Sequence, residues 1–241
     1  MTQSTATRSR QAPSRRSVLR AGAASAAAGT LALLAAAPSQ ASWPTFTTGD
    51  GGDHVWAVQR LLGERGYWCG APDGYFGALT EQAVYALQKS AGLAPDAIVG
   101  RNTLRALANW ALPPVLDEGA GTRVVIDLQR QVLTVLRDGA LQLTLNTSTG
   151  NGEPYDWYGR EMKATTPPGD FAVFSTYTKG WQTGPLGDLY RPQYFNGGIA
   201  VHGSDFIPPW PDSHGCARVS VAAMDMLWAD VMTTGTPVRV V

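Results

Sequence analysis

Four side chains in one short stretch are of the types that carry out nucleophilic catalysis. Val201–Arg218 contains His202, His214, Cys216 and Arg218, which include two of the chain's three histidines and one of its two cysteines. A cysteine attacks carbonyl groups as its thiolate, and a nearby imidazole is the usual group that takes the thiol proton. The stretch therefore predicts a cysteine nucleophile with a histidine base.

The neighbours of this cysteine favour the same chemistry. Gly215 and Ala217 flank Cys216 with little bulk, so a substrate can approach the sulfur. Gly215 also leaves the backbone free to turn N–H groups toward an oxyanion, whose stabilisation is often the largest catalytic contribution. The guanidinium of Arg218 carries planar donors that suit a carboxylate.

These residues allow two other interpretations. A single cysteine is commonly a small buried hydrophobic residue, and a single histidine is commonly structural. His202, His214 and Cys216 could also bind zinc, but the His-x-Cys spacing is tighter than usual for zinc ligands and the sequence offers no obvious fourth ligand. We expect no metal and no other cofactor.

The N-terminal 41 residues have the composition of an export signal. They contain five arginines, including the pair Arg15-Arg16, and no acidic residue, and an Ala-rich apolar run extends from Ala21 to Ala37. Ser39-Gln40-Ala41 then supplies the small residues of a cleavage site. We predict a signal peptide over residues 1–41, of the twin-arginine type, and hence export to the extracellular or periplasmic side. An ordinary signal peptide and a retained membrane anchor are the alternatives.

The remainder of the chain has a modest negative charge. It holds 14 basic residues, five fewer than the 19 of the whole chain, against 19 acidic ones. This balance argues against nucleic acid as a partner. No later segment reaches the length of a transmembrane helix, so we expect no stable membrane span after processing. Two cysteines are too few for a disulfide framework.

Residues 44–112 have the pattern of a small helical module. Apolar residues recur at helical spacing in three segments, near 55–62, 80–88 and 102–110. The turn sequence Asp73–Thr80 recurs as Asp96–Thr103, which predicts a pseudo-repeat within a three-helix bundle. Four ring residues of this module are candidates either for sugar contacts or for the core: Tyr67, Trp68, Tyr75 and Phe76.

A linker at residues 113–121 leads to a region with strand periodicity. Runs rich in β-branched residues predict strands near 124–128, 132–136, 141–147, 171–175, 199–202 and 238–241. One helix is predicted from Ala222 to Met232, with Ser220 as its cap. The predicted fold class is therefore two domains, an all-α three-helix bundle followed by a β-rich domain over residues 122–241 with one main helix.

Two polar segments, 150–166 and 176–198, show no clear strand pattern. Connections of this length without structure are usually functional or disordered. The second segment leads directly to His202 and contains Tyr194. We expect it to cover the thiol as a lid, and we expect Tyr194 to contact the substrate.

Two sequence elements resemble those of a known family. His202-Gly203 is followed ten residues later by SHGC-x-R at 213–218, and Thr166–Phe171 upstream reads TPPGDF. In this order and spacing they resemble the active-site signature of the L,D-transpeptidases of bacterial cell walls, which have a YkuD-type catalytic domain. The helical segment, with D-G-x-F-G-x-x-T at 73–80, resembles the three-helix peptidoglycan-binding module found beside wall enzymes.

The resemblance implies roles for individual residues. Cys216 would be the nucleophile and His202 its base, with the carbonyl group of Gly203 orienting the imidazole. Many relatives carry asparagine where Arg218 stands, so the polar contact to the substrate differs between branches of the family. The further roles implied are an oxyanion pocket shaped by His214 and Gly215, donor binding by Arg218, and orientation of the loop by Ser213.

The reaction implied is the formation of 3→3 cross-links in peptidoglycan. Cys216 would attack the carbonyl group between the third residue of a donor tetrapeptide stem and its terminal D-alanine. An amine of an acceptor stem would then take the acyl group. Carbapenem β-lactams are the implied inhibitors. The alternatives are an L,D-carboxypeptidase that uses water as acceptor, an inactive wall-binding protein, and a general cysteine protease.

Overall fold

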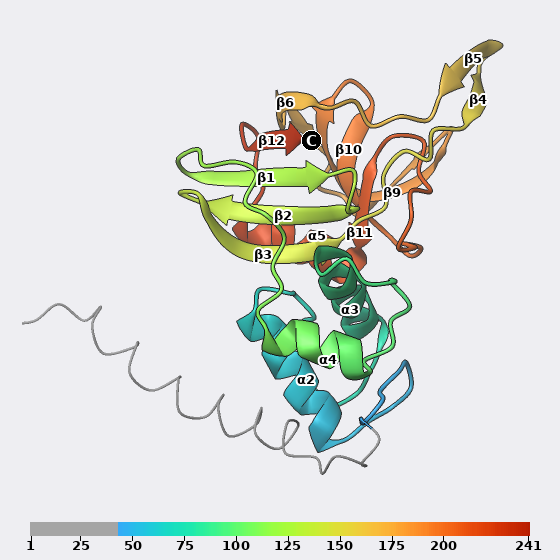
Figure 1. Ribbon diagram of the computed structural model, residues 1–241. Coiled ribbons are helices and arrows are strands. Elements are labelled where there is room, and N and C mark those ends of the chain that lie inside the picture. Colours follow the sequence, from blue (N-terminus) through green and yellow to red (C-terminus); the bar gives the residue numbers. More distant parts are fainter. Residues whose placement is uncertain (1–42) are drawn as a thin grey trace, which may run out of the picture. The chain divides into compact units, whose positions relative to one another are not determined.

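The computed structural model describes residues 43–241, in which a helical region is followed by a β-rich region (Figure 1). The predicted signal peptide, residues 1–41, lies outside the described residues. Within residues 43–241 no helix is both long enough and apolar enough to span a bilayer. The predicted fold class is confirmed, because a helical N-terminal region precedes a β-rich region with one helix.

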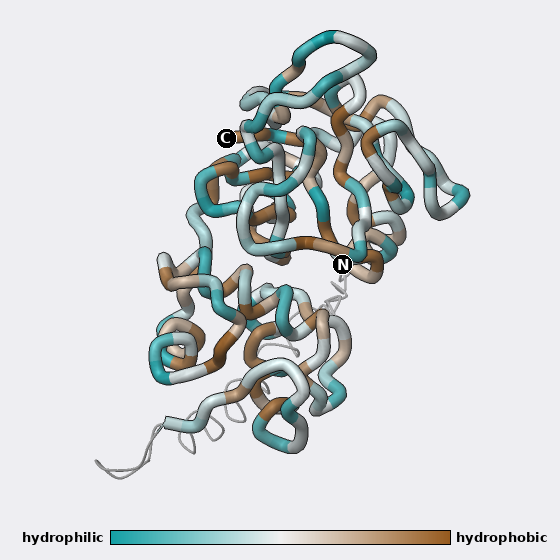
Figure 2. The backbone as a smooth tube through the Cα atoms, turned by 90° about the vertical axis from the view of Figure 1, so that its right-hand side faces the viewer, coloured by the Kyte–Doolittle hydropathy of each residue, from teal (hydrophilic) through white to brown (hydrophobic). Residues whose placement is uncertain are grey.

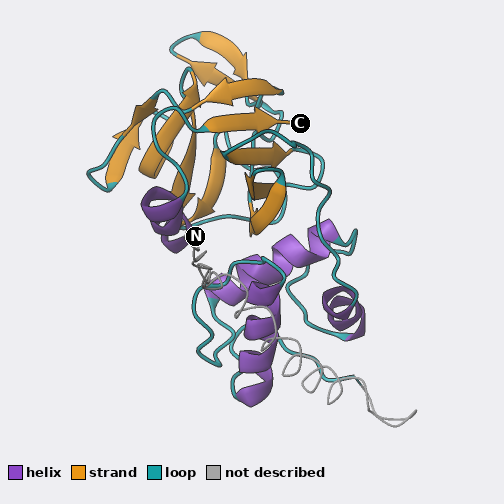
Figure 3. Cartoon of the chain, turned by 90° about the vertical axis from the view of Figure 1, so that its left-hand side faces the viewer, coloured by secondary structure: helices purple, strands orange, loops and turns teal. Residues whose placement is uncertain are grey.

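Three helices form the helical module, and they group together in Figure 3. They are α2 (Asp53–Glu64), α3 (Ala78–Ser90) and α4 (Arg101–Ala108). Each buries an apolar face, and the shared core includes Val55, Leu62, Val84, Leu87 and Leu104. The last helix ends two residues earlier than predicted, and Trp110 beyond it has a left-handed backbone conformation (φ 54°).

The pseudo-repeat of the module is confirmed as a repeated hydrogen-bond pattern. The side-chain amide of Gln59 donates to Asp73 (2.8 Å) and to the threonine seven residues further on (2.9 Å). The amide of Gln88 donates in the same way to Asp96 (2.7 Å) and to the corresponding threonine (3.2 Å). Each glutamine thus ties its own helix to the turn that starts the next one.

The β-rich region contains two five-stranded sheets. The first has the order β3–β2–β1–β12–β6, formed by β1 (Thr122–Asp127), β2 (Val132–Arg137), β3 (Ala140–Asn146), β6 (Gly169–Ala172) and β12 (Pro237–Val240). In it β1 and β12 are parallel, and the other neighbours are antiparallel. Asp138 and Gly139 both have positive φ angles, 51° and 72°, as a two-residue turn between antiparallel strands requires.

The second sheet contains the strands next to the predicted catalytic residues. Its order is β11–β10–β9–β7, with β8 also paired to β9; the strands are β7 (Ser175–Thr176), β8 (Trp181–Gly184), β9 (Gly187–Asn196), β10 (Ile199–Ser204) and β11 (Ala217–Ser220). Helix α5 (Val221–Asp230) follows β11 directly, and the Ser220 hydroxyl accepts the Ala223 N–H (3.2 Å), as predicted for its cap. One apolar core joins residues of both sheets and α5, including Ile126, Leu133, Val201, Val219 and Met224. Hydrophobic segments accordingly follow these strands, whereas several loop tips are hydrophilic (Figure 2).

The prediction of two loops without structure is wrong. Within 150–166, β4 (Pro154–Trp157) and β5 (Arg160–Lys163) form an antiparallel hairpin. Most of 176–198 belongs to β8 and β9, which also pair as a hairpin. β5 is exposed at all four positions, so no buried face imposes an apolar alternation on its sequence.

The helical module packs against the β-rich region through α3 and the segment after α2. The Trp68 N–H donates to the Thr144 carbonyl group (3.3 Å), and the Trp68 ring packs against the apolar core of the β-rich region. Lys89, at the end of α3, is 8% exposed, and its ammonium group donates to Asn146 and to the Gln131 carbonyl oxygen (2.9 Å). The two regions therefore share both apolar and buried polar contacts.

Candidate active site

The parallel strands β10 and β11 turn the predicted catalytic residues to one face. His202 pairs with Arg218 in their register, and Val201 pairs with Ala217. Val201 and Ala217 are fully buried in the core. Because side chains alternate along a strand, His202, Arg218 and Cys216 point to the opposite face. The sheet thus brings together residues that are fourteen to sixteen positions apart in the sequence.

The imidazole of His202 is buried and oriented by the backbone. It is 4% exposed, and its Nδ1 lies 2.9 Å from the carbonyl oxygen of Gly203. A carbonyl oxygen can only accept, so Nδ1 carries the proton of the neutral ring and Nε2 keeps its lone pair. Burial lowers the pKa of His202 to about 4; the contact with Gly203 acts in the opposite direction, and the charge of Arg218 lowers the pKa further. At neutral pH the ring is therefore uncharged and can accept a proton.

The thiol of Cys216 lies against β10. The Ala200 N–H donates to the sulfur, with 3.4 Å between nitrogen and sulfur. Burial raises the pKa of Cys216, while the Ala200 N–H and the charge of Arg218 partly oppose this increase. A raised thiol pKa and a lowered imidazole pKa favour a neutral pair over an ion pair. The thiolate must then form as a base removes the proton during attack.

Side-chain hydroxyl groups hold the loop that carries the cysteine. The Ser213 hydroxyl donates to the carbonyl oxygen of Cys216 (2.6 Å) and accepts the Gly215 N–H (3.0 Å). Thr166, the first residue of TPPGDF, donates to the Gly215 carbonyl oxygen (2.6 Å), so the two sequence elements meet here. Gly215 has a φ of 146°, and a Cβ at this position would lie 2.8 Å from the Thr165 carbonyl oxygen. The loop therefore requires glycine, and the Gly215 N–H is already paired with Ser213.

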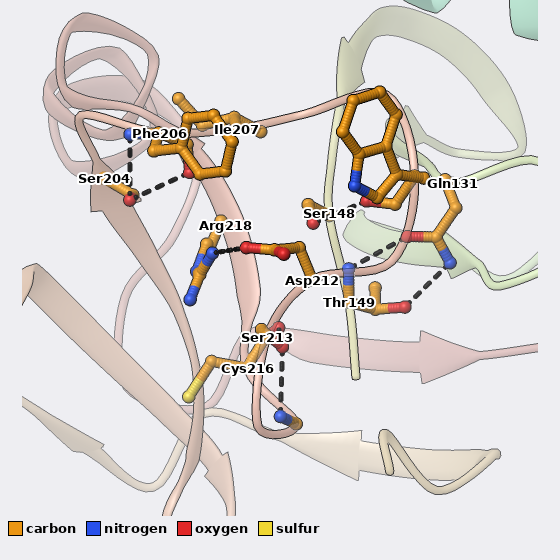
Figure 4. A network of polar contacts seen from close by, with 12 residues as sticks. Gln131, Ser148, Thr149, Ser204, Phe206, Ile207, Asp212, Ser213, Cys216 and Arg218 are labelled. Carbon is orange, nitrogen blue, oxygen red and sulfur yellow. Dashed lines mark hydrogen bonds and ion pairs between the residues drawn. The ribbon is translucent and has the colours of Figure 1, made fainter. Parts of the chain in front are cut away.

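Arg218 is held by an acidic residue that sequence analysis missed. Its guanidinium lies 2.7 Å from a carboxylate oxygen of Asp212 (Figure 4). A guanidinium has five N–H donors, so this pair leaves capacity to bind a substrate carboxylate. Asp212 thus fixes the position of Arg218 on the cysteine face of the strands.

The two remaining predicted residues lie in different surroundings. His214 is exposed, and its ring packs edge-on against Tyr155 of β4, with 4.9 Å between centroids. The Tyr194 hydroxyl donates to Gln182 of β8 (2.9 Å). Burial raises the pKa of Tyr194, and the charge of a Cys216 thiolate raises it further. Tyr194 pairs with Ala200 in the register of β9 and β10, and the Ala200 N–H donates to the Cys216 sulfur. Within residues 43–241 no three His, Cys, Asp or Glu side chains form a group suited to a metal.

A buried polar segment behind the loop was also missed. Thr147, Ser148 and Thr149 are at most 1% exposed. The Thr149 carbonyl oxygen accepts the Ser213 N–H (2.9 Å), and the Thr147 hydroxyl donates to the Arg218 carbonyl oxygen (2.8 Å). The side-chain amide of Gln131 donates to the Thr149 hydroxyl (2.7 Å), and its oxygen accepts a hydrogen bond from the Thr149 N–H (2.9 Å), as Figure 4 shows. The only trace in the sequence is a run of serine and threonine after a strand, which is common in turns.

We expect acid to destabilise the fold through His202. Its pKa is about 4 in the folded chain and near 6.5 when unfolded, so between these values the unfolded chain binds more protons. Stability should therefore fall as the pH drops from 6.5 to 4, by roughly 3 kcal/mol for this group. Urea unfolding at pH 7, 5 and 4 measures the loss. His202→Gln should lose less over the same range, and an equal loss would contradict this origin.

Comparison with known proteins identifies the class. The L,D-transpeptidase catalytic domain family, YkuD, matches residues 121–240, and a peptidoglycan binding domain family matches residues 51–107. A solved structure of an L,D-transpeptidase (residues 123–326) from Xylanimonas cellulosilytica DSM 15894 is 44% identical, covers 85% of this chain and 100% of that chain, and has a TM-score of 0.78. The chain belongs to the L,D-transpeptidase family with a YkuD-type catalytic domain, and it carries an N-terminal peptidoglycan-binding domain.

The chain is also similar to two further proteins. An L,D-transpeptidase (Yku) from Stackebrandtia nassauensis is 23% identical over 81% of this chain and 94% of that chain, with a TM-score of 0.46. The N-acetylmuramoyl-L-alanine amidase CwlM of Mycobacterium tuberculosis (strain ATCC 25618 / H37Rv) is 43% identical over 56 residues, or 23% of this chain. The match spans only 14% of the amidase.

Proposed function

We propose that this L,D-transpeptidase forms 3→3 cross-links between peptidoglycan stems through an acyl-enzyme on Cys216. The observation that carries the proposal is the placement of a neutral imidazole, oriented by Gly203, on the same strand face as the thiol. This is the arrangement that activates a cysteine for acyl transfer. The family of the catalytic domain and the peptidoglycan-binding domain support the cell wall as the substrate.

The proposed reaction has two half-reactions. In the first, His202 takes the proton of Cys216 as the sulfur attacks the carbonyl carbon of the third stem residue. The C–N bond to D-alanine breaks, and His202 returns the proton to the leaving amine. In the second, the acceptor amine attacks the thioester and loses its proton to His202. The cross-link forms and Cys216 regains its proton. Arg218, held by Asp212, would bind a carboxylate of the donor stem, and Tyr194 would contact the stem near the sulfur.

Product analysis tests this function. Wild type incubated with a disaccharide-tetrapeptide should yield free D-alanine and a dimer that has lost one D-alanine, both detected by mass spectrometry. Cys216→Ala should yield neither. Tripeptide without dimer would instead identify an L,D-carboxypeptidase. No release of D-alanine by wild type, with binding to insoluble wall retained, would indicate a wall-binding protein.

The helical module would hold the enzyme on the wall. Of the four ring residues considered, Tyr67 and Phe76 are fully buried, and Trp68 packs against the apolar core of the β-rich region. Tyr75 is 54% exposed, so it is the one of these four that is free to contact a sugar. Export by the twin-arginine route remains a proposal from residues 1–41, and N-terminal sequencing of exported protein should find Ser42 first. An uncleaved chain in the membrane fraction would indicate an anchor.

A further inference from the structure

A groove of about 390 Å³ lies between the helical module and the β-rich region. One wall is α3, with Glu81 and Tyr85, and the opposite wall is the loop after β10, with Asp205, Phe206 and Trp210. Nothing in the reaction described above uses this groove. Both regions contribute to it, so it exists only because the module is docked on the β-rich region.

The groove begins on the face that carries the catalytic thiol. Ser204 and Ser220 form the last pair in the register of β10 and β11, and both line the groove. Arg218 and Cys216 lie two and four residues before Ser220, on the same face by strand alternation. Four residues of strand correspond to roughly 13 Å. In Figure 4 the Phe206 ring and the Cys216 sulfur accordingly lie on opposite sides of Arg218.

This distance matches the length of the donor stem. Under the proposed function, the carbonyl group attacked by Cys216 belongs to the third residue of the stem. Three extended residues span about 10 Å from that carbonyl group to the sugar that bears the stem. A donor held on Cys216 and extended along β11 would thus bring its sugar to the mouth of the groove. The groove is too far from the sulfur to hold the attacking amine of the acceptor.

The chemistry of the walls fits an uncharged sugar chain. Phe206 and Trp210 are 59% and 57% exposed, and their flat faces together with Tyr85 offer apolar platforms. Glu81 and Asp205 can accept hydrogen bonds from hydroxyl and acetamido groups. Among the lining residues, all of which the structure describes, there is no lysine, arginine or histidine. The two carboxylates would repel the free carboxylate of a stem peptide.

We propose that this groove binds the N-acetylated glycan strand that carries the donor stem. The inference rests on the proposed function and adds a glycan subsite shared by the two regions. Stem and sugar are then bound together, so a donor attached to its glycan is preferred over a free tetrapeptide. The peptidoglycan-binding module would contribute directly to donor recognition as well as to retention on the wall.

Kinetics with two donors test the subsite in the full chain. Release of D-alanine is measured with a disaccharide-tetrapeptide and with the same tetrapeptide without sugar. The double variant Phe206→Ala/Trp210→Ala should raise the KM of the sugar-bearing donor about tenfold, leave kcat unchanged and leave the free tetrapeptide unaffected. The matched control is Phe174→Ala, because Phe174 is a similarly exposed ring (56%) outside the groove. An equal rise for both donors, a rise only in the KM of the acceptor, or no change would overturn the proposal.

A binding measurement separates this inference from the proposed function. A β-1,4-linked tetramer of N-acetylglucosamine is titrated into the full-length Cys216→Ala protein by calorimetry. Binding should weaken about tenfold when Phe206 and Trp210 are also replaced, and it should persist with Phe174→Ala. No binding, or equal binding by all variants, would overturn the glycan subsite. If wild type releases D-alanine from neither donor, the proposed function fails, and the calorimetric result alone decides the subsite.

Discussion

Replacing His202 is expected to reduce turnover of a tetrapeptide donor by about 10²- to 10⁴-fold, the range supplied by a positioned general base. Burial keeps the imidazole neutral at pH 7 and raises the pKa of Cys216, so the thiol depends on His202 to lose its proton. His202→Ala should therefore also slow the labelling of Cys216 by iodoacetamide at pH 7. His202→Gln, which fills more of the buried space, should show the same loss.

His214→Ala is the matched comparison for this prediction. His214 is only two residues from Cys216, but its ring is exposed and packs against Tyr155. Its replacement should impair turnover through the shape of the loop and leave the labelling rate close to that of wild type. Labelling rates between pH 6 and 10 distinguish the two histidines. A slower rate for His214→Ala together with an unchanged rate for His202→Ala would reverse the assigned roles.

The second large effect is expected at Lys89, where the helical module meets the β-rich region. The buried ammonium donates to Asn146 and to the carbonyl oxygens of Gln131 (2.9 Å) and Thr147 (3.2 Å). These three acceptors match the three protons of an ammonium group, although burial lowers the pKa of Lys89 to about 7. Lys89→Met keeps most of the side-chain length but leaves the acceptors buried without this donor. The free energy of unfolding should fall by about 3 kcal/mol.

An exposed lysine provides the control for Lys89. Lys163 in β5 is exposed, so Lys163→Met should change the free energy of unfolding by less than about 0.5 kcal/mol. Denaturant unfolding compares the two variants with wild type. Thr147 also donates to the Arg218 carbonyl oxygen, so Lys89→Met should slow turnover of a soluble donor as well. Equal stability of the Lys89 and Lys163 variants would show that this contact does not hold the two regions together.

The parts of the site that could be predicted from the sequence are local or belong to a short element. Cys216, Ser213 and Gly215 lie within four residues of one another. His202 belongs to the short His-Gly motif that precedes them along the chain. The pairing of His202 with Gly203 needs only adjacent residues. The helices were also predictable, because apolar residues recur at helical spacing on their buried faces. The inner strands were predictable as continuous apolar runs, since β2 is buried at five successive positions.

The supporting contacts could not be predicted, because their partners are far apart and of ordinary types. Lys89 reaches Asn146 across 57 residues. Gln131 and Thr149 pair across 18 residues, and neither residue type indicates a site without its partner. The hairpin of β4 and β5 could not be predicted for a different reason. Its exposed strands have no buried face that would impose an apolar pattern on the sequence. The groove beside α3 forms where the helical module packs against the β-rich region, so no pattern in the sequence of either region indicates it.

The central claim, that Cys216 forms the acyl-enzyme, is tested most directly by intact mass after incubation with a carbapenem. A second thiol provides an internal control, because Cys69 is 4% exposed and burial raises its pKa to about 11. Wild type should gain one adduct that peptide mapping places on Cys216, and Cys216→Ala should gain none. An adduct that survives Cys216→Ala, or one that maps to Cys69, would contradict the assignment of Cys216 as the nucleophile.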